Sequence, residues 1–126
     1  MKQQIKTKSA PKPIGPYSQA IIYKDLCFLS GQIGINYQTN ELKTSSIEEE
    51  TEMIMKNISN ILLENDLTTD NIIKTTIYMT DLTKFERVNS VYAKFFKKTY
   101  PARETVQVSA LPMNVNIEIS VIAGLK

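Results

Sequence analysis

The spacing of apolar residues changes along this chain from strand-like alternation to helical steps and back, and this order restricts the fold more than any other feature. Apolar and polar side chains alternate in residues 115–123, whereas Ile54, Ile58 and Ile61 recur at helical steps. The complete order is strands at 17–23 and 26–30, a helix at 46–64, a strand at 71–79, a helix at 82–98, and strands at 104–111 and 115–123. Two helices among these strands predict an α+β sandwich in which the helices cover one face of a mixed sheet. The length of 126 residues predicts one domain over residues 1–126.

Short signals mark the connections near the N-terminus. Weak alternation around Ile5 predicts a short strand, and Lys24-Asp25 predicts a two-residue hairpin turn without the Gly that such turns prefer. Residues 10–16 hold three prolines and a glycine, which predicts a loop packed against the domain rather than a linker. Gly31 and Gly34 are interpreted as residues of turns and irregular chain.

The two helices carry start and stop signals. Ser46 and Glu49 are three residues apart, as in a capping box. The acidic residues Glu48, Glu49, Glu50 and Glu52 are interpreted as favourable charges at a helix N-terminus on a solvated face, not as a metal site. Thr80-Asp81 predicts the start of the second helix, and Tyr100-Pro101 predicts its end.

Two helices can cover only one face of a sheet, so the composition of the opposite face becomes informative. Alternation assigns a mixed set of side chains to that face, namely Thr105, Gln107, Asn116, Glu118, Ser120 and Ile122. Mixed faces of this kind are often buried against other subunits. Two interpretations of Glu118 stay open: a solvated residue in an alternating pattern, or a partly buried carboxylate at an interface, with a raised pKa suited to proton transfer.

The residue types that are missing exclude much chemistry. The chain has no His and a single Cys, Cys27, which excludes Ser-His-Asp and Cys-His catalysis, His-ligated zinc, Cys-rich metal sites and an internal disulfide. A general base must therefore be Asp, Glu, Lys, Tyr or water. Only Arg87 and Arg103 are arginines among 15 basic residues. Arg87 is interpreted as a surface residue. Arg103 is either a surface ion-pair or helix-end cation, or a group that binds a carboxylate or phosphate through two parallel hydrogen bonds.

Charge and targeting signals restrict partners and location. The net charge is +2 and the isoelectric point about 8.6, below the value above ~9 that is typical of dedicated nucleic-acid domains. The N-terminus lacks the apolar segment of a secretory signal, and no apolar run approaches the ~18 residues of a membrane span. The sequence therefore predicts a cytoplasmic protein without a membrane partner.

Four segments carry a resemblance to a known family: IGPYSQA at 14–20, LSGQI at 29–33, KTTIYMTD at 74–81 and YPARETV at 100–106. Leu111-Pro112 and the strand of Glu118 extend the match toward the C-terminus. Each segment alone is a weak signal, but all of them occur in order and in register. On these residues the chain resembles the Rid family of reactive intermediate deaminases, also called the YjgF family.

The resemblance implies a chorismate-mutase-like α+β fold, with a mixed six-stranded sheet and two helices on one face. It also implies a homotrimer in which the sheets form a barrel and the active sites lie between subunits. The implied reaction is hydrolysis of imines and enamines, such as 2-aminoacrylate and 2-iminobutanoate, to 2-oxo acids and ammonia. The resemblance implies no cofactor and no metal.

The family's site residues correspond to positions of this chain. Arg103 would hold the substrate carboxylate, and Glu118 would position and activate the attacking water or return its proton to the leaving nitrogen. The implied substrate-binding positions are Tyr17, Ser30, Gly31, Asn89 and Thr105, with Gly31 and Thr105 contributing backbone groups.

This chain departs from the family at three positions. Thr105 stands where many relatives carry Cys, Asp66 stands where a Gly is common, and Glu50 stands where Gln is frequent. Neither Asp66 nor Glu50 is expected to touch the proposed site.

Two other functions are weighed against the deaminase. Some relatives are described as endoribonucleases or translation inhibitors, and an RNA-directed role receives little support from a net charge of +2. The third hypothesis is a chaperone-like module that binds small ligands in the same clefts.

Overall fold

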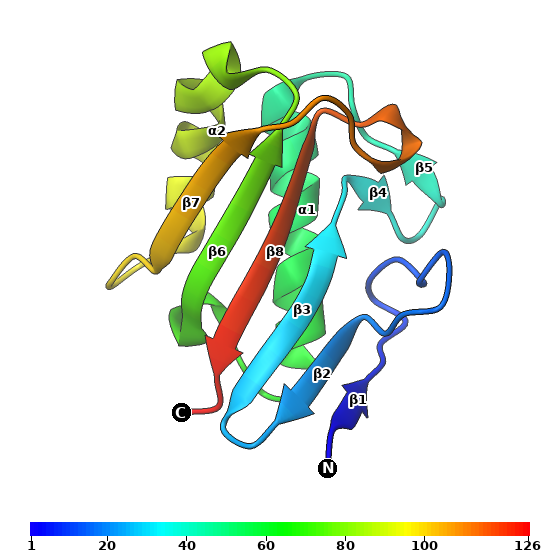
Figure 1. Cartoon of the computed structure of the whole chain (residues 1–126), viewed down its shortest axis with the longest axis vertical. Helices are drawn as coiled ribbons and strands as arrows, with labels where there is room; N and C mark the ends of the chain where they lie inside the picture. Colours follow the sequence, from blue (N-terminus) through cyan, green and yellow to red (C-terminus); the bar gives the residue numbers. More distant parts are fainter.

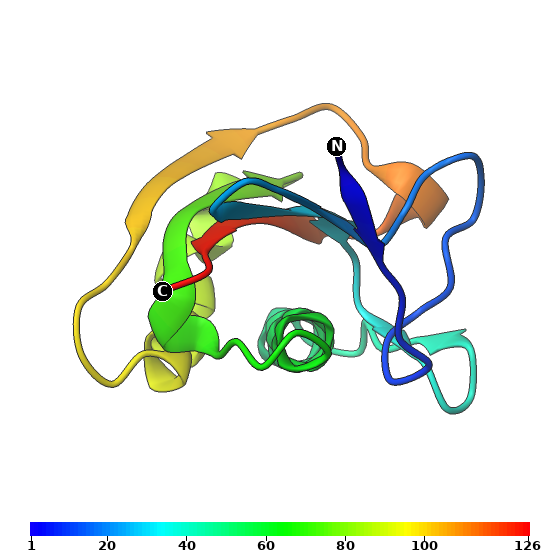
Figure 2. The same cartoon turned by 90° about the horizontal axis from the view of Figure 1, so that it is seen from below.

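A twisted six-stranded sheet packs one face against two helices in the computed structural model, which describes all residues 1–126 (Figure 1). The strands are β1 (Gln3–Ile5), β2 (Ala20–Tyr23), β3 (Leu26–Gln32), β6 (Ile72–Met79), β7 (Ala102–Gln107) and β8 (Ile117–Gly124), in the spatial order β1-β2-β3-β8-β6-β7. Only β6 and β7 pair in parallel, so the sheet is mixed. The helices α1 (Ile47–Leu63) and α2 (Phe85–Tyr92) lie on the same side of it (Figure 2). The expected α+β fold, with two helices on one face of a mixed sheet, is confirmed.

Short elements connect these layers. A small hairpin of β4 (Ile35–Asn36) and β5 (Glu41–Leu42) follows β3. Single 3-10 turns occupy Thr69–Asn71, Leu82–Lys84, Ala93–Phe95 and Pro112–Asn114. The core lies between the sheet and the helices, and no helix is both long enough and apolar enough to cross a membrane.

The first hairpin differs from the prediction at both ends. The turn at Lys24-Asp25 is confirmed, and Lys24 itself takes the left-handed conformation, with φ 54°, that Gly usually supplies. β2 starts at Ala20 instead of residue 17. The Gln19 side chain just before it forms hydrogen bonds to the backbone of residues 7 and 11 in the preceding segment. β3 continues through Gly31, with a bulge between Leu29 and Gln32, so the interpretation of Gly31 as a turn residue is wrong.

Helix α1 begins as predicted, but its acidic first turn is not uniformly solvated. The Ser46 side chain accepts a hydrogen bond from the Glu49 backbone N at 3.1 Å, whereas the Glu49 carboxylate binds Ser45, so only half of the capping box forms. Glu50 is completely buried, which corrects its placement on a solvated face. After the helix, Asp66 adopts φ 58°, a left-handed conformation that favours Gly, the residue that the family resemblance led us to expect there.

The second helix is shorter than the predicted 82–98. Asp81 caps the 3-10 turn that precedes α2, and the helical segment ends at Phe95 instead of Tyr100-Pro101. Phe96 leaves the helix in an extended conformation, and its ring packs 4.8 Å from that of Tyr92. This aromatic contact in the core takes the chain out of the helical path before the proline is reached.

Candidate active site

Glu118 lies on the sheet face that no helix covers. Its register partner on β6 is Tyr78, whose own partner on β7 is Val106, so the three side chains form a row across this face. Ile117 and Ile119, the residues before and after Glu118 on β8, are fully buried and face the helices. Glu118 is half-buried, and loss of solvation raises the pKa of its carboxyl above the ordinary value. Of the two interpretations of Glu118, the structure therefore supports the partly buried carboxylate.

The residues around Glu118 form a hollow of about 430 Å³, here called the Glu118 hollow. Three residues expected at the site line it, namely Tyr17, Ser30 and Gly31, together with apolar side chains such as Ile33. The Ser30 hydroxyl donates to the Ser18 carbonyl at 2.6 Å and so ties β3 to the loop that carries Tyr17. The structure thus brings these three residues to Glu118.

Gly31 is required by the position of the Glu118 carboxylate. A β-carbon on Gly31 would overlap Glu118 Oε2 and would lie 2.8 Å from Glu118 Cδ. The missing side chain therefore lets the carboxylate lie directly against the backbone of β3.

Arg103 lies on the opposite face of the sheet, near its edge. It pairs in register with the buried Thr75 of β6. Its Nη1 donates to Asn89 Oδ1 at 2.7 Å, and its guanidinium carbon is 5.2 Å from the ring centroids of both Phe85 and Tyr92. These contacts from α2 orient the guanidinium by a hydrogen bond and by cation–π attraction.

No carboxylate neutralises Arg103, because none of the three ion pairs in the structure includes it. The surface ion-pair interpretation is therefore wrong for Arg103. Arg87 lies on the surface, as expected, and pairs there with Glu48 at 2.8 Å. Arg103 and Asn89 instead line a hollow of about 480 Å³ beside Tyr100, here called the Arg103 hollow.

Thr105 does not lie on the uncovered face as alternation alone predicted. Its register partner on β6 is the fully buried Ile77, so Thr105 faces the helices, as Arg103 does. Its hydroxyl oxygen is buried without a hydrogen-bond partner. Two further residues assigned to the uncovered face also turn away from it. Gln107 Oε1 accepts from the Leu82 backbone N, and the Asn116 side chain binds Glu50. For Thr105 and Gln107, the parallel register between β6 and β7 decides this orientation.

Each chain therefore holds two separate groups of site residues. Glu118 gathers with Tyr17, Ser30 and Gly31, whereas Arg103, Asn89 and Thr105 lie on the other face. Strand β6 lies between β8, which carries Glu118, and β7, which carries Arg103. No three His, Cys, Asp or Glu side chains gather where they could hold a metal ion.

Sequence reasoning missed the role of Glu50 in positioning Glu118. The Glu50 carboxylate accepts hydrogen bonds from Asn116 N at 2.9 Å, Asn116 Nδ2 at 2.8 Å and Ile117 N at 3.3 Å. It therefore holds the start of β8 directly before Glu118. A signal was present, because Glu50 lies between Ile47 and Ile54 on the apolar stripe of α1.

Comparisons with known proteins identify the family and agree with the fold. A family described as Endoribonuclease L-PSP matches residues 7–125. The chloroplastic Reactive Intermediate Deaminase A of Arabidopsis thaliana is 44% identical over 98% of this chain and 66% of its own length, so this chain spans about two thirds of that relative. The solved structure of YyfA, a Rid protein of Yersinia pestis, has TM-score 0.96 and 48% identity over 98% of this chain and 99% of its own. The structure of E. coli TdcF with bound serine has TM-score 0.93 and 38% identity over 97% and 98%.

Proposed function

Because this chain belongs to the Endoribonuclease L-PSP family, which includes the Rid or YjgF proteins, we propose that it hydrolyses reactive 2-imino acids and their enamines to 2-oxo acids and ammonia. A relative named as a reactive intermediate deaminase supports this class of reaction, and a relative with bound serine supports a ligand of amino-acid size. The observation that carries the proposal is a pre-oriented, unpaired Arg103 together with a half-buried Glu118 of raised pKa.

Arg103 would bind the carboxylate of the substrate. A planar guanidinium donates two parallel hydrogen bonds to a carboxylate, and this pairing selects 2-imino acids over neutral imines. Within the chain, only Nη1 of Arg103 donates a side-chain hydrogen bond, to Asn89, so the other guanidinium N–H groups remain for a substrate. Contact with the Phe85 and Tyr92 rings limits how the guanidinium plane can turn. We propose that the Thr105 backbone adds a further contact to the same carboxylate.

Glu118 would act on water and on the leaving nitrogen. The substrate reacts as the iminium, with its nitrogen protonated. The Glu118 carboxylate takes one proton from water while the water oxygen bonds to the iminium carbon and the C=N electron pair moves to the nitrogen, giving a neutral tetrahedral aminoalcohol. Glu118 then returns that proton to the nitrogen, the C–N bond breaks with its electron pair leaving on ammonia, and the hydroxyl proton passes to the Glu118 carboxylate as the oxygen closes the carbonyl. A raised pKa suits both steps, because the group accepts and returns a proton closer to neutral pH. Ser30, Gly31 and Tyr17 would form the wall beside the reacting carbon.

The two groups of site residues lie on opposite faces of one chain, which favours a site formed between chains. We propose a homotrimer in which the Arg103 hollow of one copy meets the Glu118 hollow of the next, with the uncovered sheet faces inside a barrel. A head-to-tail contact of this kind closes into a ring. The uncovered face carries apolar side chains that are more than a third exposed, namely Tyr23, Leu26, Phe28 and Val106. Such a surface is typical of a subunit interface.

A coupled assay tests the function. A dehydratase generates 2-aminoacrylate from serine, and the rate of 2-oxo acid formation is measured with and without this protein. We expect acceleration by the wild type, loss of that acceleration in Arg103→Ala, and wild-type behaviour in Arg87→Ala, the matched control on the surface. No acceleration by the wild type, or equal acceleration by Arg103→Ala, would refute the proposal. We further expect the protein to act in the cytoplasm.

A further inference from the structure

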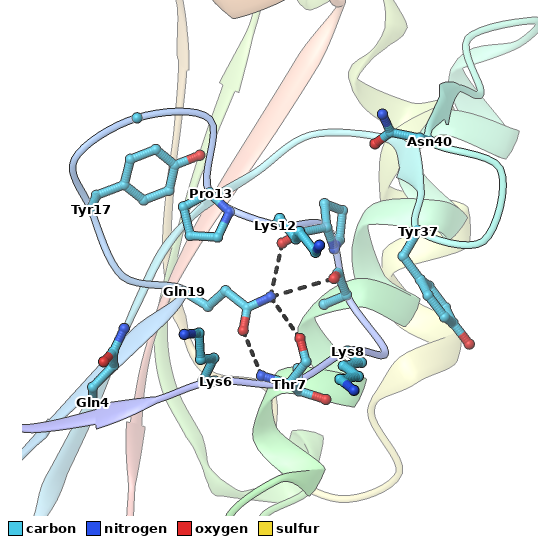
Figure 3. A pocket seen from close by; sticks show the side chains of 13 residues that line it. Gln4, Lys6, Thr7, Lys8, Lys12, Pro13, Tyr17, Gln19, Tyr37 and Asn40 are labelled. Carbon is cyan, nitrogen blue, oxygen red and sulfur yellow. Dashed lines mark hydrogen bonds between the residues drawn. The ribbon is translucent and has the colours of Figure 1, made fainter.

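A further hollow, which shares Tyr17 with the Glu118 hollow, is lined by three lysines and no carboxylate. It has a volume of about 1190 Å³, and its cationic side chains are Lys6, Lys8 and Lys12 (Figure 3). We call it the lysine hollow. None of these lysines takes part in any of the three ion pairs of the structure. Three of the 13 lysines thus surround one concavity in a chain whose net charge is only +2. Positive charge is therefore concentrated there.

The chain segment that carries these lysines is held in place by hydrogen bonds from the buried side chain of Gln19. Gln19 is only 3% exposed, and its amide binds Thr7 N at 2.7 Å, Thr7 O at 3.1 Å and Pro11 O at 2.8 Å (Figure 3). Asn60 of α1 donates to Ser9 O at 2.7 Å and anchors the same loop to the helix. The expectation of a packed loop is confirmed, and the lysines therefore project from an ordered backbone.

We propose that the lysine hollow binds the di- or triphosphate group of a small phosphorylated ligand. Lysines act as point charges toward phosphate oxygens, and the side-chain amides of Gln4 and Asn40, which also line the hollow, supply further donors. Tyr37 also lines the hollow and offers a ring face to a nucleobase. Most of the residues that line the hollow are polar or charged, which suits a charged ligand.

The proposal does not depend on deaminase activity. The lysine hollow and the Glu118 hollow share Tyr17 but differ in chemistry, because the first carries three lysines and the second carries Glu118 and apolar side chains. A long RNA strand would require a continuous basic stripe, and a net charge of +2 does not provide one over the whole surface.

Calorimetric titrations with inorganic tripolyphosphate and with ATP test the proposal on the full-length protein. We expect both to bind at 50 mM salt and to bind more weakly at 200 mM, because exposed charges are screened within ~10 Å at 0.1 M. The triple variant Lys6→Gln/Lys8→Gln/Lys12→Gln should weaken both by about tenfold or more. The matched variant Lys24→Gln/Lys97→Gln/Lys98→Gln removes the same charge from exposed positions elsewhere and should bind as the wild type does.

The two probes distinguish the source of the phosphate chemistry. Tyr37→Ala should weaken ATP if the ligand is a nucleotide, and should leave both probes unchanged if the phosphate chain alone is recognised. Absence of binding by both probes, or equal losses in the two triple variants, would overturn the proposal. Tighter binding of single-stranded RNA that both triple variants weaken equally would overturn it as well. Far-ultraviolet circular dichroism of each variant checks that the fold is retained.

Discussion

The Glu118 carboxylate occupies the space that a side chain on Gly31 would fill, since a β-carbon there would overlap Oε2 and would lie 2.8 Å from Cδ. β3 and β8 are far apart in sequence but pair in the sheet. The space left by the missing side chain of Gly31 on β3 is filled by the Glu118 carboxylate of β8. This relationship makes Gly31 a positional determinant of the proposed water-activating group.

Gly31→Ala should displace the carboxylate and lower kcat/KM by about 100-fold, the cost of a ~1 Å misplacement of a reacting group. The backbone of Gly31 needs no left-handed conformation, so the protein should still fold. Gly124→Ala is the matched control, because its nearest contact is the flexible end of Ile73 at 3.2 Å, at the far end of β8. The coupled assay measures the rates, and equal rates for Gly31→Ala and wild type would contradict the positional role.

The raised pKa of Glu118 predicts opposite pH trends for activity and stability. As a base Glu118 must be ionised, so kcat/KM should fall as pH decreases through the raised pKa. A folded-state pKa above the unfolded value means that the folded chain holds the proton longer. The free energy of unfolding should therefore decrease as pH rises from the unfolded pKa of ~4.3 through the folded one.

Glu118→Gln tests both trends. It should lower kcat/KM by about 100-fold or more, and it should remove the part of the stability change with pH that comes from Glu118. Glu104→Gln is the control, since Glu104 lies on the same face but is exposed and paired with Lys74 at 2.8 Å. Full activity in Glu118→Gln would show that this residue does not handle the water.

Glu50 should be replaceable by Gln but not by Ala. Ala leaves the backbone donors of Asn116 and Ile117 without partners in the interior, which costs about 1–3 kcal/mol of the free energy of unfolding. Gln keeps one acceptor for both donors and can donate to the Asn116 amide after that amide rotates. Denaturant unfolding gives the stabilities. If Glu50 positions β8, kcat should fall in Glu50→Ala at temperatures where the variant is fully folded, and equal kcat in the two variants would limit Glu50 to stability.

Tyr92 combines a structural hydroxyl with a ring that contacts Arg103. Its hydroxyl shares a hydrogen bond of 2.8 Å with the buried Thr75, and burial raises the pKa of Tyr92. Tyr92→Phe should lose about 1–3 kcal/mol of unfolding free energy, because the buried Thr75 hydroxyl is left without a partner. KM should stay unchanged, because the ring remains. Tyr92→Leu should lose stability and also raise KM, because it removes the ring that contacts the Arg103 guanidinium. Unchanged KM in the Leu variant would show that the ring does not orient Arg103.

Mixing two inactive variants tests whether the site lies between chains. Arg103→Ala supplies an intact Glu118 and Glu118→Gln supplies an intact Arg103, so a mixed trimer should regain one complete site. Random equimolar mixing during co-expression should restore about a quarter of the wild-type sites. Light scattering checks the trimer itself. No recovery of activity in mixed trimers would place both residues in sites within one chain.

Local patterns were sufficient for the order and type of the main elements, but not for all of their ends. The alternation around Glu118, the helical stripe of α1 and the Ser46 cap depend on neighbours within a few residues, and these predictions match the structure. The resemblance singled out Arg103 and Glu118 among many charged residues. The packed loop at residues 10–16 could also be predicted, because prolines disfavour both helix and β-sheet pairing there.

What only the tertiary structure decided is where those groups lie relative to one another. Thr105 was assigned to the wrong face because alternation establishes which residues of a strand share a face but not which face that is. The register of β7 against β6 sets the orientation, and these strands are joined through a helix, so the pairing is non-local. The same holds for Glu50, whose burial depends on β8, more than 60 residues away in sequence. The sequence by itself therefore determined which charged groups this protein carries, while long-range pairing placed Arg103 and Glu118 on opposite faces of one sheet.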